Sequence, residues 1–248
     1  MTRIILIHHH IFKNAGTSFN YALKQYFGEN FFEFDLPDSK AVTQNHLRRF
    51  ILQHPQALAI SSHHACMPTP QGKDFQTISS VLLRKPLARI KSVYNFERKQ
   101  QAQTEGAIKA KEMEFKDYVL WRLEKTPVMF CNYQTHYCSR VKHLSGKCRV
   151  TEEHLKIAIQ NLKKCVIVGT VERYQDTLKI AQNKLAQFYP KINLEFVTLN
   201  KSPEINSPEE PRNLLIEELG TDIVNKMEAM NQLDYRLYGV AEEILEQA

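Results

Sequence analysis

Hydrophobic positions along the chain occur as short continuous runs that alternate with longer segments of helical periodicity. The short runs are rich in Ile, Leu, Val and Phe, and they predict strands over residues 3–8, 31–34, 57–61, 77–83 and 165–168. The longer segments predict helices over residues 17–27, 42–53, 86–96, 114–124, 151–163 and 172–188. Strands that alternate with helices in this way favour an α/β fold with a central parallel sheet flanked by helices.

Local signals support several of these boundaries. Pro86 suits the first residue of a helix, and Thr151 suits the N-cap of another, with acidic side chains in its first turn. Residues 199–211 carry three prolines and several Ser and Asn, which is typical of a loop. Two further helices are predicted over 214–230 and 231–245. Because no repeat and no linker-like composition interrupts the pattern, we expect a single domain over residues 1–248.

Length and composition narrow the class of protein. The 248 residues, of which 43% are hydrophobic, are enough for a full core. No apolar run approaches the roughly 18 residues that a membrane span needs, and the first residues lack the layout of a signal peptide. We therefore expect no stable membrane insertion and a cytoplasmic location. Five scattered cysteines predict buried thiols, with a disulfide between Cys138 and Cys148 as the alternative.

The formal charge of +6 by itself suggests a nucleic-acid-binding protein. The basic residues form no single run, however, and several lie in motifs suited to bind a small anion. We therefore expect an anionic nucleotide as the ligand and no nucleic-acid partner. An anionic acceptor substrate is also compatible with this charge.

The segment HIFKNAGTS, residues 10–18, carries the most specific chemistry. It joins a predicted strand to a predicted helix, so backbone N–H groups at the helix start, the helix dipole and Lys13 favour an anion there. Gly16 permits close approach of the backbone, and Thr17 and Ser18 add hydroxyl donors. In a Walker-type loop the lysine follows the glycines, whereas here Lys13 precedes Gly16.

That order resembles the 5′-phosphosulfate loop of sulfotransferases that use 3′-phosphoadenosine 5′-phosphosulfate (PAPS). It is most similar to the branch containing the carbohydrate sulfotransferases, where the loop commonly reads His-Ile-Pro-Lys-x-Ala-Gly-Thr-Ser. The resemblance implies a P-loop-like fold, a 5′-phosphate held by Lys13 and residues Asn14, Ala15, Gly16, Thr17 and Ser18, and a leaving oxygen stabilised by Lys13. Phe12 stands where the family has proline.

A second motif, VLLRKPLARIKSVYN at residues 81–95, places Arg84 at the end of a strand and Ser92 two turns into a helix. Arg84 can grip a phosphate in a fork, and Ser92 can donate from the same side. The motif resembles the family's 3′-phosphate motif, Arg-Asp-Pro-x-x-Arg-x-x-Ser-x-Tyr, which implies that Arg84 and Ser92 bind the 3′-phosphate. Lys85 replaces the usual aspartate, and for Arg89 a surface position is as well supported as a ligand role.

A third motif, Ser62-His63-His64, follows another predicted strand. It resembles the Gly-His segment of heparan 2-O-sulfotransferase-like enzymes, in which the histidine is the general base. A neutral imidazole within reach of a hydroxyl suits that task. We therefore expect His63 to be the base, with His64 as the alternative because Ser62 replaces the usual glycine.

Further segments resemble the family less specifically. Residues 166–174 resemble a segment near the nucleotide, and Lys201 lies in a loop where it is a possible phosphate contact. Asp234 to Tyr238 resemble a closing Asp-x-x-Leu-Tyr pattern, which we interpret as packing. Three adjacent histidines, His8 to His10, alternate faces of a strand and so cannot share one metal ion. We expect no metal cofactor.

Together these motifs predict a PAPS-dependent sulfotransferase that moves a sulfuryl group to a hydroxyl, with a carbohydrate acceptor expected by resemblance. The polar segment 100–111 and the stretches 31–37 and 68–75 are candidates to line the acceptor site. Two alternatives are a P-loop-type small-molecule kinase and a catalytically inactive nucleotide- or glycan-binding relative. The sequence leaves the acceptor and the oligomeric state open.

Overall fold

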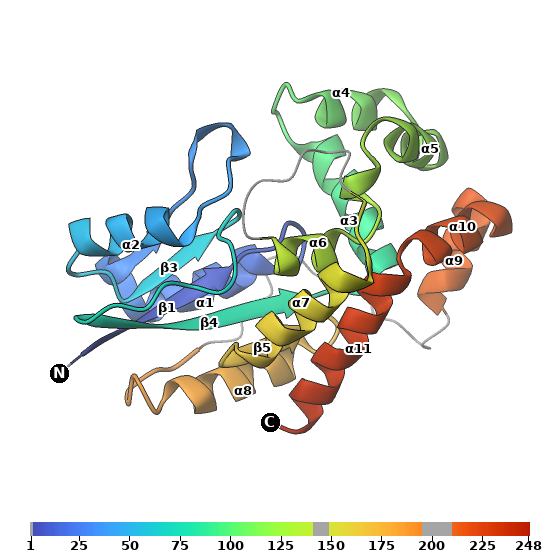
Figure 1. Ribbon diagram of the computed structural model, residues 1–248. Coiled ribbons are helices and arrows are strands. Elements are labelled where there is room, and N and C mark those ends of the chain that lie inside the picture. Colours follow the sequence, from blue (N-terminus) through green and yellow to red (C-terminus); the bar gives the residue numbers. More distant parts are fainter. Residues whose placement is uncertain (1, 141–148, 195–209) are drawn as a thin grey trace.

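The fold is built on a parallel sheet, seen in a computed structural model that describes residues 2–140, 149–194 and 210–248 (Figure 1). In the order β2-β3-β1-β4-β5 its strands are Phe31–Glu33, Ala59–Ser62, Arg3–His9, Phe75–Leu83 and Ile167–Thr170. Every pair of neighbours is parallel. The predicted central parallel sheet is therefore confirmed, and its strands all end at one edge, the carboxyl edge.

Helices follow the strands and fill the connections. Their bounds are α1 Gly16–Phe27, α2 Gln44–Gln53, α3 Pro86–Lys99, α4 Glu105–Glu112, α5 Phe115–Lys125, α6 Tyr133–Ser139, α7 Glu152–Lys163, α8 Tyr174–Leu185, α9 Glu210–Leu219, α10 Thr221–Met230 and α11 Gln232–Glu246. Thr151 forms a capping box with His154 at the start of α7, as its position predicted.

The two faces of the sheet bury different sets of helices because successive residues of a strand point to opposite sides. On one face Leu6 of β1 packs with apolar residues of α1 and α8. On the other face Ile5 and Ile7 pack with α2, and Val81 and Leu83 of β4 pack with α6, α7 and α11. Helices therefore cover both faces, as predicted for a doubly covered parallel sheet.

A separate group of helices lies beyond the carboxyl edge, and we call α3, α4, α5, α9 and α10 the helical cap (Figure 1). Its own apolar cluster includes Ile90, Tyr118 and Phe130, all buried. The loop after β1 contacts this cap, because Phe12 packs against its apolar cluster.

Three local features differ from the sequence predictions. Helix α4 begins within the polar segment 100–111, to which the sequence analysis assigned no element. The helix predicted over 214–230 is two helices, because Gly220 between α9 and α10 has φ 86°, a conformation that ends a right-handed helix. Helix α6 was not predicted at all. Lys201 lies outside the described residues, as does the predicted loop 199–211 except for its last two residues, which begin α9.

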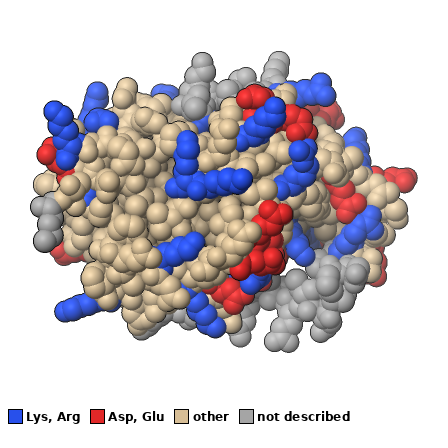
Figure 2. All heavy atoms as spheres, turned by 60° about the horizontal axis from the view of Figure 1, so that its bottom comes forward, with Lys and Arg blue, Asp and Glu red and all other residues tan. Residues whose placement is uncertain are grey.

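Surface charge is mixed rather than concentrated on the face shown in Figure 2. Lys and Arg side chains are spread singly and in small groups, and Asp and Glu lie among them. The excess of positive charge is therefore not gathered into one continuous patch on this face. Within the ranges that the structure describes, no helix is long and apolar enough to cross a membrane.

Candidate functional site

The loop between β1 and α1 has the backbone shape of an anion cradle. Lys13 and Ala15 have φ 67° and 58°, in the left-handed region that side chains rarely favour. Such residues next to right-handed ones turn successive N–H groups to one side and form an anion-binding concavity. Ala15 is also the N-cap of α1, so the first N–H groups of this helix lie at the same place.

Gly16 is required by a close contact rather than by its φ angle. A Cβ atom added here would lie 1.9 Å from Cδ2 of the His10 ring. Any larger residue would push the ring or the loop aside, because such a distance lies far inside van der Waals contact. The sequence predicted a glycine here so that a phosphate could approach the backbone. The structure adds a second reason, the close contact with the His10 imidazole.

Hydrogen bonds to β4, to the residue that follows it and to α6 hold this loop in place. Nδ2 of Asn14 donates to the Leu82 carbonyl at 2.9 Å and to Oε1 of Gln134 at 2.7 Å. Nη1 of Arg84 donates to the Lys13 carbonyl at 3.1 Å. The two predicted anion-binding motifs, which are 71 residues apart in sequence, are therefore in direct contact at the carboxyl edge.

The positive charges of Lys13 and Arg84 lie at this edge, and the acidic group that acts on Arg84, Glu172, lies beyond ion-pair distance. Among the described residues neither Lys13 nor Arg84 takes part in an ion pair, and the buried Nε of Arg84 has no hydrogen-bond partner. Burial lowers the pKa of Lys13, and the nearby Arg84 charge lowers it further. Burial likewise lowers the pKa of Arg84. Two partly desolvated cations side by side favour binding of an anion between them.

Helix α3 presents one face to the loop. Arg89 is buried rather than superficial, and its Nε donates to the Phe12 carbonyl at 3.1 Å. The ring of Phe96 lies 4.3 Å below Nζ of Lys13 and contacts Phe12 edge to face. Ser92 lies three residues after Arg89 and four before Phe96, so it shares this helix face and is half-buried. Its contact with a phosphate stays a prediction.

The surface alternative for Arg89 is therefore wrong. Nη1 of Arg89 donates to the Met129 carbonyl at 2.8 Å, and its guanidinium stacks on the Tyr133 ring at 3.8 Å. The helical periodicity of α3 alone cannot reveal that Arg89 is buried, because its partners come from the segment before α6 and from α6 itself. Arg89 joins the helical cap to the entrance of the anion loop.

His63 lies after β3, next to the loop, in a defined tautomer. Its Nδ1 is 3.0 Å from the His10 carbonyl, and because a carbonyl only accepts, Nδ1 must donate. When the ring is neutral, a proton on Nδ1 leaves the lone pair of Nε2 for a proton from another group. The His63 ring also stacks on His10, with centroids 3.9 Å apart.

The turn that carries His63 is held by a carboxylate that the sequence analysis missed. Asp35, just after β2, accepts from the Ser62 hydroxyl at 2.8 Å and from the backbone N–H groups of His63 and His64 at 3.2 and 3.0 Å. The replacement of glycine by Ser62 thereby gains a partner. Asp35 follows a strand of the parallel sheet, so the strand-end rule that selected Arg84 also pointed to it.

The three adjacent histidines form no metal site. His8 packs against Phe19 on one face of the sheet and His9 against Tyr137 on the other, as alternation predicted. Burial lowers the pKa of His9 to about 4. Burial, followed by the charges of His63 and Lys13, lowers the pKa of His10 to about 3. Within the described residues no group of His, Cys, Asp and Glu is arranged to hold a metal ion.

Two C-terminal motifs make specific contacts with the site. Glu172 accepts from the Lys85 backbone N–H at 3.1 Å and from the Tyr238 hydroxyl at 3.0 Å. Asp234, interpreted from the sequence as packing, instead accepts from the N–H groups of Gln134 and Thr135 at the start of α6. Gln134 is the second residue that the sequence analysis missed. Cys66, Cys131, Cys138 and Cys165 are free thiols, and Cys148 lies outside the described residues.

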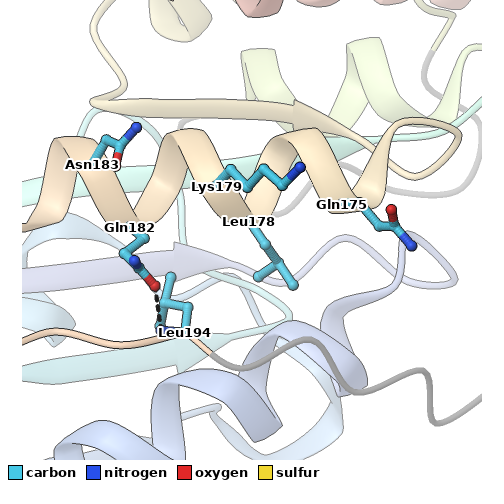
Figure 3. A pocket seen from close by; sticks show the side chains of 6 residues that line it. All are labelled: Gln175, Leu178, Lys179, Gln182, Asn183 and Leu194. Carbon is cyan, nitrogen blue, oxygen red and sulfur yellow. Dashed lines mark hydrogen bonds between the residues drawn. The ribbon is translucent and has the colours of Figure 1, made fainter.

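A cavity of about 520 Å³ lies along α8, away from these groups (Figure 3). Gln175, Leu178, Lys179, Gln182, Asn183 and Leu194 line it, and the dashed line joins the Leu194 N–H to Gln182 Oε1 at 2.9 Å. No lining residue belongs to the predicted site. The cavity and the predicted site are therefore separate places in the fold.

Comparison with known proteins identifies the family of this chain. The sequence model described as "Sulfotransferase family" matches residues 3–240. An uncharacterized protein of Archaeoglobus fulgidus is 28% identical over 246 residues, which cover 96% of each chain. Since the family match spans nearly the whole sequence, including the loop after β1, Arg84 and His63, the chain belongs to the sulfotransferase family.

Proposed function

We propose that this sulfotransferase takes its sulfuryl group from PAPS and transfers it to a hydroxyl group of a carbohydrate. The donor assignment rests on the resemblance of residues 10–18 and 84–92 to the two phosphate-binding motifs. The choice of a carbohydrate rests on the resemblance to one branch of the family. The single-domain extent over 1–248 and the cytoplasmic location stay predictions from the sequence.

The observation that carries the proposal is the contact between Arg84 and the carbonyl of Lys13. It joins a concave backbone loop to a guanidinium with an unsatisfied Nε, and neither cation has a carboxylate partner in the described chain. A nucleotide with phosphates at both its 5′ and 3′ positions fits this arrangement. The loop with Thr17 and Ser18 would hold the 5′ end, and Arg84 with Ser92 the 3′ end.

In this proposal Lys13 acts on the leaving group and His63 acts on the acceptor. The acceptor oxygen forms a bond to sulfur while the bond from sulfur to the bridging phosphate oxygen breaks, and the bisphosphate nucleotide leaves with those electrons. Lys13 stabilises the negative charge on that oxygen. Nε2 of His63 takes the acceptor proton, and Asp35 and the His10 carbonyl hold the ring for it.

Titration calorimetry with 3′-phosphoadenosine 5′-phosphate, the spent donor, tests the donor assignment first. We expect wild-type protein to bind it with a Kd on the order of micromolar, about 8 kcal/mol, and Arg84→Ala to weaken this strongly. Folded wild-type protein that fails to bind would refute the proposal.

Transfer from radiolabelled PAPS to a panel of oligosaccharides and simple alcohols then tests the reaction. Labelled oligosaccharide supports the carbohydrate acceptor, and labelled simple alcohols alone contradict it. Magnesium-dependent ATP turnover in the same preparation would indicate the kinase alternative. Binding without any transfer would indicate the inactive relative.

A further inference from the structure

The side chain of Gln134 connects the two predicted phosphate-binding motifs. Its Oε1 accepts from the Arg84 backbone N–H at 2.8 Å and from Nδ2 of Asn14 at 2.7 Å, and its Nε2 donates to the Arg84 carbonyl at 2.8 Å. The orientation of the amide is fixed, because the Arg84 N–H can only donate and its carbonyl can only accept. Gln134 is fully buried, so no water competes for these bonds.

These contacts imitate a neighbouring strand. Strand β4 ends at Leu83, and Gln134 then pairs with both backbone groups of Arg84, as a further strand residue would. The same amide reaches Asn14, which lies between the two left-handed residues of the anion loop. One side chain therefore sets the positions of the Arg84 backbone and of the loop relative to each other.

Gln134 is itself held from two sides. Asp234 at the start of α11 accepts from the N–H groups of Gln134 and Thr135, and Oδ1 of Asn132 accepts from the N–H groups of Leu233 and Asp234. The first turns of α6 and α11 thus cap each other. Asp234 is buried, and the N–H groups of Gln134 and Thr135, with the Thr135 hydroxyl, satisfy its carboxylate.

We propose that Gln134 is a positioning residue that holds the 5′-phosphate loop and Arg84 at a fixed mutual distance, so that one nucleotide engages both. It does not itself touch the nucleotide. Gln134 affects the simultaneous binding of one nucleotide by the 5′-phosphate loop and by Arg84. This simultaneous binding is lost when the distance between the two motifs no longer matches the span of the ligand. This inference rests on the proposed function.

Gln134→Met tests it, since methionine keeps the shape and removes the three hydrogen bonds. Calorimetry compares 3′-phosphoadenosine 5′-phosphate with adenosine 5′-phosphate and adenosine 3′-phosphate. We expect affinity for the bisphosphate to fall about tenfold or more, while each monophosphate changes less than about threefold, because each needs only one motif. An equal loss for all three ligands, or no loss for the bisphosphate, overturns the inference.

Gln71→Met is the matched control. Gln71 pairs with the N–H and carbonyl of Thr77 in the same way, at 3.1 and 3.0 Å, but near the opposite end of β4. It should leave the affinity ratio of bisphosphate to monophosphate unchanged. If Gln134→Met does not fold, Asn14→Ala keeps both bonds between Gln134 and Arg84 but removes the Asn14 bonds to Gln134 and to the Leu82 carbonyl, and it should lower the same ratio. Wild-type protein that binds no bisphosphate refutes the proposed function, whereas binding with a uniform loss refutes only the role of Gln134.

Discussion

Two arginines, one in the helical cap and one at the carboxyl edge of the sheet, have opposite surroundings. Nη2 of Arg122 in α5 lies 2.7 Å from both carboxylate oxygens of Glu97, and its Nε donates to the Tyr118 hydroxyl at 2.8 Å. Tyr118 also bonds to Glu97. Arg84 donates instead to a backbone carbonyl, that of Lys13, and no carboxylate within the described residues pairs with it.

Their pKa shifts differ in sign for the same reason. Burial by itself lowers the pKa of Arg122, but the hydrogen bonds with Glu97 and Tyr118 outweigh it and leave this pKa raised. Burial lowers the pKa of Arg84, and the more distant charge of Glu172 does not compensate. A guanidinium with an internal counterion serves the fold, whereas one without a counterion is suited to an external anion.

The largest effect should come from His63, which lies with Arg84 at the carboxyl edge of the sheet. His63→Ala should lower kcat for sulfuryl transfer about 10²–10⁴-fold, because the acceptor proton loses its base. Affinity for 3′-phosphoadenosine 5′-phosphate should stay within about twofold, since the ring donates to the carbonyl of His10, at the start of the loop segment, and not to Lys13 or Arg84. His154→Ala, a histidine of the α7 capping box, is the control and should keep kcat. An unchanged kcat in His63→Ala contradicts its role.

In the helical cap the effect should be on stability. Arg122→Met leaves the buried Glu97 without its partner and should lower the free energy of unfolding by about 3–5 kcal/mol in urea denaturation. Nucleotide affinity of the folded variant should not change. The double variant Arg122→Met with Glu97→Gln should recover most of the loss, because no charge is left buried. If the double variant is as unstable as the single one, the packing of the arginine matters more than its charge.

The matching change at the sheet edge should show the reverse pattern. Arg84→Met should weaken binding of 3′-phosphoadenosine 5′-phosphate about tenfold to a hundredfold, the size of lost hydrogen bonds to a charged group. Its free energy of unfolding should change by less than about 1 kcal/mol, because methionine removes a desolvated charge along with one hydrogen bond. A loss of stability as large as that of Arg122→Met would show that the two arginines are equivalent.

The sequence was informative where one local rule decides the structure. Short apolar runs predicted the five strands, and the strand-end rule placed Arg84 and His63 at one edge. Left-handed residues lie in the predicted anion loop at residues 13–18, and anion binding there stays a prediction. Each of these inferences uses residues within about one strand or one helix of each other.

Contacts between distant segments were not predictable in this way. Helix α6 is short, and six of its seven residues are buried, so it shows no amphipathic period. The partners of Gln134 lie 50, 100 and 120 residues away, at Arg84, Asp234 and Asn14. A single sequence contains no signal for such pairings. The burial of Arg89 was missed for the same reason.

The smallest effect we predict concerns the neutral histidines beneath the cations. Burial, and to a smaller extent the Arg140 charge, lowers the pKa of His9 from its usual 6.5 to about 4. Between about pH 6.5 and 4 the unfolded chain therefore binds more protons than the folded protein. The free energy of unfolding is largest above about pH 6.5 and falls as the pH decreases towards 4. In His9→Leu the loss of unfolding free energy between about pH 6.5 and 5.5 should be smaller by about 1 kcal/mol. Urea denaturation at the two pH values measures this loss. Equal losses in wild type and variant would mean that His9 protonates without unfolding.

A reduced loss would support the contrast with the helical cap. In the cap a carboxylate neutralises the buried arginine, whereas at the carboxyl edge the buried histidines stay uncharged and leave the positive charge of Lys13 and Arg84 for the ligand.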